Sequence, residues 1–179
     1  MDQIIEDGFM RLTETINELD RSIDELDTAI RSDLAGLLSR MVALTTPLIG
    51  SLGQQFLQKT KKDGKEELYD TIHYDEKMII IGRAEEPVTI RPDNMTRKVD
   101  KQFCVLTEKG AIAELMYSDD GFIIDSYLNP LTAEDAIDFY GPGVIYMLYR
   151  ALHDYANLEE ELIRSLEMTI AFIQGEKKE

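Results

Sequence analysis

The first third of the chain repeats apolar residues with the period of a coiled-coil helix. From Ile5 to Ile30 the steps between apolar residues alternate between four and three without a slip, which is the a/d pattern of a heptad. After Ile30 the next apolar residue is Leu34, so two consecutive steps of four form a stutter. The pattern predicts one helix from about residue 3 to about residue 45. Its apolar seam consists of Ile5, Phe9, Leu12, Ile16, Leu19, Ile23, Leu26, Ile30, Leu34, Leu37 and Met41.

A second, shorter helix is expected directly after this one. Thr46 followed by Pro47 has the form of an N-cap and a first helical residue. The lysine-rich segment 59–65 suits the end of that helix, because cations are favoured near the negative pole of a helix. The sequence therefore predicts a helical segment over residues 1–65.

From about residue 77 the period of the apolar residues changes from 3.5 to 2. Five short runs alternate in this way and are separated by turn residues, which is typical of strands. The turns between 102–107, 111–117 and 121–127 are short enough to predict a three-stranded antiparallel meander. We assign residues 66–131 to this meander.

The last part of the chain, residues 132–179, returns to a helical pattern. Thr132 and Asp135 have the spacing of a capping box, and a final amphipathic helix is expected from about Val144 to about Gln174. The predicted fold class is α+β, with a long coiled-coil-like N-terminal helix and a C-terminal amphipathic helix flanking a small antiparallel β-meander. The C-terminal helices are expected to pack on the sheet, on the N-terminal helix, or on both.

This order of elements resembles the layout of prefoldin-type chaperone subunits, from which the helix expected after Pro47 departs. Small acidic chaperones of secretion systems also combine a meander with flanking helices. These resemblances of layout imply a chaperone-like or adaptor role.

The heptad predicts a helical partner but leaves its identity open. Isoleucine at a and leucine at d favour two-stranded parallel coils. One flank of the seam, the e positions, is largely acidic, whereas the g positions hold Gly8, Thr15, Ser22 and Ala29, so no g-to-e charge pairs are encoded. The small g residues favour a helical bundle over an isolated coil. The partner is a second copy (a dimer is our first expectation), another protein, or the C-terminal helix of the same chain.

Composition and charge narrow the classes of partner. The chain has 179 residues, 44% of them hydrophobic, and a formal net charge of -16. Such an acidic chain disfavours nucleic acid, and the longest apolar window is broken by charged and polar residues, which disfavours a membrane span. The middle of the chain is locally basic, and its cations either protect a strand edge or form a docking surface for an acidic partner. These residues are Arg83, Arg91, Arg97, Lys98 and Lys101.

The single cysteine, Cys104, excludes an internal disulfide. The N-terminus lacks the basic region and apolar core of a secretory signal, so we expect a reducing, cytoplasmic location.

Residues that carry chemistry are few, and we expect no catalytic residues, no bound metal and no cofactor. His73 lies beside Tyr74, Asp75 and Glu76, yet neighbours in one segment seldom point at a common centre. The leading hypothesis is a non-catalytic assembly, adaptor or chaperone-like protein that oligomerises through its N-terminal helix. The alternative is a small-molecule sensor with a pocket between the sheet and the C-terminal helix. The residues expected around that pocket are Tyr127, Tyr140, Tyr146 and Tyr149.

Overall fold

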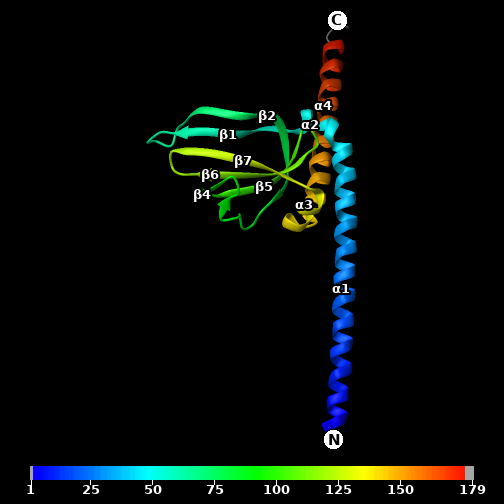
Figure 1. Ribbon diagram of the computed structural model, residues 1–179. Helices are drawn as coiled ribbons and strands as arrows, with labels where there is room; N and C mark the ends of the chain where they lie inside the picture. The colour runs from blue at the N-terminus through cyan, green and yellow to red at the C-terminus, as the bar shows by residue number, and fades with distance from the viewer. Residues whose placement is uncertain (1, 176–179) are drawn as a thin grey trace.

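The computed structural model describes residues 2–175 and confirms the α+β class. A body of strands and short helices carries two long helices, which leave it in opposite directions (Figure 1). Helix α1 spans Asp2–Thr45 and helix α4 spans Gly143–Gly175, close to the bounds expected from their periodicity. At 1.5 Å per residue, α1 is roughly 66 Å long. Most of the length of α1 and α4 therefore lies outside the body of the protein.

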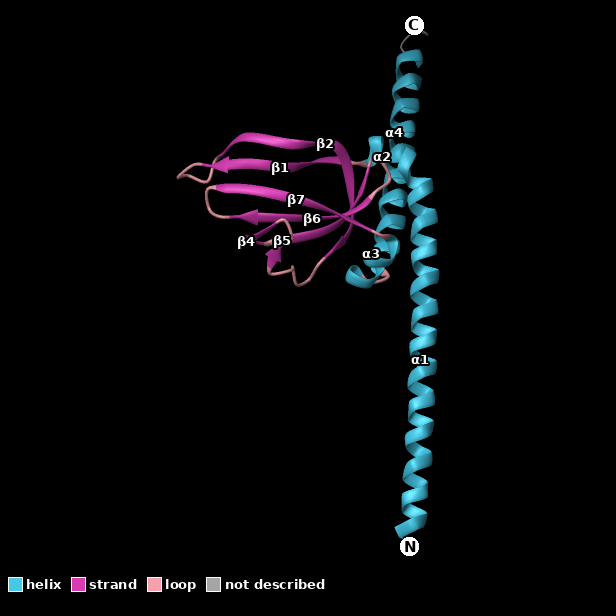
Figure 2. Ribbon diagram, in the orientation of Figure 1, coloured by secondary structure: helices cyan, strands magenta, loops and turns pink. Residues whose placement is uncertain are grey.

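The body is a closed antiparallel barrel, drawn in magenta in Figure 2, with strand order β1-β2-β5-β6-β7. Strand β1 closes it by pairing with β2 on one side and with β7 on the other. Strand β2 serves two neighbours, because its first part pairs with β1 and its last part with β5. The barrel strands are β1 Gln54–Lys62, β2 Leu68–Arg83, β5 Lys101–Thr107, β6 Ile112–Asp119 and β7 Ile123–Leu131.

The predicted meander is confirmed as strands β5, β6 and β7. Val105 lies opposite Ala113, and Leu115 lies opposite Leu128. Because side chains alternate across a strand, Val105, Ala113 and Leu115 face a core inside the barrel, and Cys104 on β5 belongs to a second core outside it.

The outer core lies between the barrel and the helices. Leu38 and Val42 of α1, together with Val144 and Leu148 of α4, pack against the outward side chains of β2 and β5. Helix α3, Ala133–Tyr140, covers the same face and begins with the expected capping box, in which Thr132 and Asp135 exchange hydrogen bonds of 3.0 and 3.1 Å. These contacts fix the last third of α1 and the first third of α4 to the body.

The prediction of a second helix that begins at Pro47 and ends near residue 65 is wrong. A 3-10 turn at Thr46–Leu48 and the single-turn helix α2, Ile49–Leu52, are all that forms. The chain then leaves at Gly53, where an added Cβ would lie 2.7 Å from the Ile49 carbonyl oxygen. Residues 54–62 form β1, so the helical segment ends at Leu52 and not at residue 65.

The segment between β2 and β5 folds over the barrel. Residues 87–92 are one of the five alternating runs that the sequence predicts as strands, but only Ile90–Arg91 form a strand, β3, which pairs with β4, Asn94–Lys98. Arg91 holds this hairpin down, because its guanidinium donates to Asp93 at 2.6 and 2.9 Å and to Asp125 of β7 at 2.7 Å.

Candidate functional site: the exposed arm of helix α1

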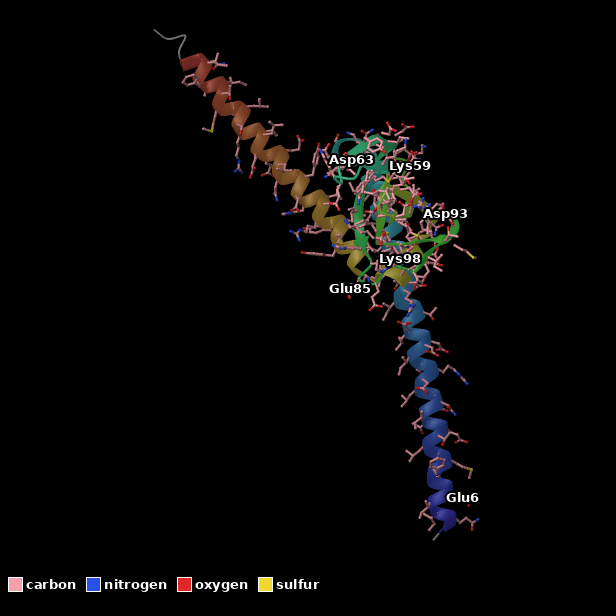
Figure 3. The ribbon with its side chains drawn as sticks, turned by 90° about the vertical axis from the view of Figure 1, so that its left-hand side faces the viewer. Glu6, Lys59, Asp63, Glu85, Asp93 and Lys98 are labelled. Carbon is pink, nitrogen blue, oxygen red and sulfur yellow. The ribbon has the colours of Figure 1, made fainter. Side chains whose placement is uncertain are left out.

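The strongest candidate site is the free part of α1, residues 5–30, which we call the arm. It extends away from the body (Figures 1 and 3), and Glu6 marks its distal end in Figure 3. Its last turn, at Asp27 and Thr28, lies beside Glu134 and Asp138 of α3. All eight a and d side chains of the arm are exposed, with exposed fractions from 54% to 71%. They are Ile5, Phe9, Leu12, Ile16, Leu19, Ile23, Leu26 and Ile30.

The stutter after Ile30 marks the junction between the arm and the body. Leu34 and Met41 pack against the outer core, whereas Leu37 faces solvent. The predicted seam therefore divides into a solvent-facing part and a body-facing part. Arg31 ties the junction to α3 by donating to Asp138 at 2.8 Å.

The polar residues that flank the arm seam are satisfied within the helix. The hydroxyls of Thr13, Thr15 and Ser22 donate to carbonyl oxygens one turn earlier at 2.9 to 3.0 Å. These groups need no partner for hydrogen bonding. The apolar face of the arm, in contrast, is exposed to solvent.

Helix α4 does not cover that face within residues 2–175. Its distal half points away from the arm, and Figure 3 shows the two helices diverging from the body. That half carries a second exposed stripe, which comprises Leu158, Leu162, Leu166, Ile170 and Ile173. A fold-back of α4 on the arm, one of the expectations from the sequence, is not present in this single chain.

The basic residues proposed as a docking surface do not act as one set. Arg91 is only 5% exposed and is paired with two carboxylates, so it serves the fold. Arg97 pairs with Asp120 at 2.8 Å, and Arg83 lies beside the Phe103 ring. Lys98 and Lys101 are exposed.

The four tyrosines proposed for a pocket are separated. Tyr146 and Tyr149 are exposed on α4, and Tyr127 lies beneath the guanidinium of Arg91. Tyr140 at the end of α3 donates to Glu114 at 2.9 Å, and burial, reinforced by this bond, raises the pKa of its hydroxyl.

Sequence reasoning missed the buried polar cluster around Glu114. Its carboxyl group accepts from Gln102 at 2.5 Å and from Asn129 at 3.3 Å, in addition to Tyr140. A glutamate at an outward position of the otherwise apolar run AIAELMY was the available signal. All of its bonds are to neutral donors, which stabilise the packing of α3 on the barrel.

Groups suited to catalysis or metal binding are scarce. Among residues 2–175 no cluster of three or more His, Cys, Asp or Glu side chains is arranged to hold a metal ion. His73 is exposed on β2. Burial raises the pKa of the Cys104 thiol to about 12, so this cysteine is a poor nucleophile.

No protein-family model matches the chain, and neither a curated protein nor a solved structure matches it. One helical stretch within Gln3–Leu52 is long and apolar enough to cross a membrane by length and composition, and 28% of it is buried in the protein. A single stretch of this kind is weak evidence for a span.

Proposed function

We propose that the protein is a non-catalytic assembly or adaptor protein that self-associates through its arm to form a parallel two-stranded coiled coil. We prefer this coil to the helical bundle that the small g residues favour, because α4 points away from the arm and supplies no further helix to a bundle. The observation that carries this proposal is the unbroken a/d stripe, every member of which is more than half exposed. A coiled-coil helix without a partner leaves its hydrophobic seam in water, and pairing removes that cost.

The size of the exposed stripe suits a stable dimer. Eight large side chains, each more than half exposed, amount to roughly 600–900 Å² of apolar surface on each copy, and a standard interface buries about 800 Å² per partner. The arm alone thus supplies enough apolar surface for one copy to bind another.

The charges flanking the stripe favour the parallel orientation. In a parallel coil each e position faces a g′ position of the partner, so the acidic Asp20 and Asp27 face the uncharged Thr15 and Ser22 of the second copy. In an antiparallel coil e faces e′, and these carboxylates oppose one another. The residues at a and d, isoleucine and leucine, support the same choice.

A parallel coil also indicates which surface of the dimer is free to contact another protein. Both barrels lie at the same end of the coil, and both α4 helices project beyond that end with their apolar stripes exposed. We propose that this end is where an adaptor or chaperone-like protein contacts its client. We propose no membrane span, because Leu38 and Val42 from the apolar part of α1 are buried in the outer core.

The test compares two neighbouring substitutions that each add one negative charge. Ile16→Asp places a carboxylate on the seam, and Asn17→Asp places it on the outer face of the same turn. In sedimentation velocity we expect Asn17→Asp to sediment as the wild-type oligomer and Ile16→Asp as a monomer with an intact barrel. Equal behaviour of the two variants would contradict the proposal.

A further inference from the structure

The barrel holds a cavity that the packing of its own side chains leaves open. Its volume is about 710 Å³. The buried side chains of Met78, Val105, Ala113 and Leu115 fill part of the barrel interior. The cavity lies beside them, next to the start of β5 and the end of β6. Its apolar walls are formed by Phe56, Leu57, Ile80, Phe103, Tyr117 and Ile124.

These wall residues are only half-buried, although apolar side chains inside a small barrel normally fill its interior. Phe103 and Tyr117 meet edge to face with their ring centroids 6.3 Å apart, which keeps both rings at the wall. Apolar pockets of about 300–1,000 Å³ with a few polar groups at fixed places are typical ligand sites. The cavity therefore has the size and the lining of a site for a small apolar molecule.

The polar groups at the rim indicate the charge of the ligand. Asp100 accepts the backbone N–H of Asp119 at 2.8 Å, and Asp119 in turn pairs with Lys62 and accepts the Gly121 N–H at 2.9 Å. Both carboxylates thus accept hydrogen bonds within the fold, and Lys62 offsets the charge of Asp119, whereas Asp100 keeps its charge. Lys101 lines the same rim, is exposed, and forms no ion pair with another residue of the described chain, 2–175. A cation without a partner beside an apolar wall suits an anionic headgroup.

We propose that the barrel cavity binds a medium-chain fatty carboxylate, with its hydrocarbon chain among Phe56, Phe103 and Ile124 and its headgroup beside the ammonium of Lys101. The site lies on the barrel, whereas self-association uses the arm. The proposal therefore stands independently of the oligomeric state.

The experiment is calorimetric titration of the full-length protein with decanoate and, separately, with decylammonium, which has the same chain and the opposite charge. Wild type is expected to bind decanoate saturably, at one site per chain and at concentrations below about 1 mM, and more tightly than decylammonium. No saturable heat, or tighter binding of decylammonium, would overturn the proposal.

Two matched pairs of variants locate the site. Lys101→Met is expected to weaken decanoate about fivefold, as loss of one partly exposed ion pair would, whereas Lys98→Met has no effect. Ile124→Trp fills the cavity and is expected to weaken binding more than about tenfold, whereas Ile72→Trp on the exposed part of β2 leaves it unchanged. Leu57→Trp fills the same cavity from β1 and replaces Ile124→Trp if circular dichroism shows that variant to be unfolded.

Ile16→Asp on the arm should bind decanoate as wild type does. Loss of binding in that variant, with normal binding by Lys101→Met and the cavity-filling variants, would assign the ligand to the arm and overturn the cavity proposal.

Discussion

Leu37 follows Ile30 by one heptad, and both side chains face solvent, with 37% and 57% of their surface exposed. Between them Leu34 has already packed against the barrel. The a positions of the heptad thus continue past the junction, and Leu44, one heptad further on, is exposed as well. The helix therefore presents one face to the body and leaves another exposed to solvent.

Adjacent residues at the junction should separate folding from assembly. Leu38 is fully buried in the outer core, so Leu38→Ala is expected to lower the free energy of unfolding by about 2–5 kcal/mol. Leu37→Ala should leave the barrel stable and weaken self-association. Urea unfolding and sedimentation of both variants check this, and a shared phenotype would contradict the division of faces.

The orientation of the arms can be read by cross-linking. Leu12→Cys and Leu26→Cys occupy two d positions, and in a parallel, in-register pair each is expected to form a disulfide with its own counterpart. An antiparallel pair brings at most one of these positions next to itself. Wild type serves as the control on a non-reducing gel, because its only thiol, Cys104, is buried. Self-linking of one variant alone would reject the parallel coil.

The cluster around Glu114 should matter for stability. Tyr140→Phe removes the hydroxyl that donates to Glu114 at 2.9 Å, and leaves a buried carboxyl group with one donor fewer. We expect a loss of about 1–2 kcal/mol in the free energy of unfolding. Tyr149→Phe on the exposed face of α4 is the control and should stay within about 0.5 kcal/mol of wild type. Equal stability of both variants in urea would contradict this role.

The hairpin of β3 and β4 should loosen in acid. The pKa of Asp93 is held below its usual value near 3.8, chiefly by the hydrogen bonds from Arg91. A carboxyl group with a lowered pKa stabilises the fold above its unfolded pKa, and this contribution is lost as the pH falls through the folded pKa. The protection of the Val99 amide, which donates to Thr89, against hydrogen exchange, measured relative to the intrinsic exchange rate at each pH, should therefore fall below about pH 4. Arg91→Met should show fast exchange of this amide already at neutral pH. Unchanged exchange in that variant would show that Arg91 does not hold the hairpin on the barrel.

The long helices and the meander were predictable because their periods are clear. The heptad from Ile5 to Ile30 runs without a slip, and short turns join the apolar strands β5 and β6, which the barrel buries on both faces. The capping box at Thr132 was predictable for a local reason, since the same two residues satisfy each other's backbone.

Closure of the barrel was not predictable in the same way. Register shifts between Gln55 and Leu57, and again near Lys59 and Lys61, interrupt the alternation of β1. The early part of β2 is exposed on both faces, so no alternation of apolar and polar residues marks it as a strand. Without β1 there is no barrel interior, and the cavity beside Lys101 could not be anticipated.

The absolute mass of the full-length protein, measured by light scattering over a range of concentrations, tests the central claim most directly. One chain has a mass of 20.5 kDa. We predict twice that mass, with dissociation only on dilution and less of it at high salt, because the acidic arms repel one another and salt screens the repulsion. A mass of 20.5 kDa at every concentration and salt level would contradict the claim that the arm binds a second copy.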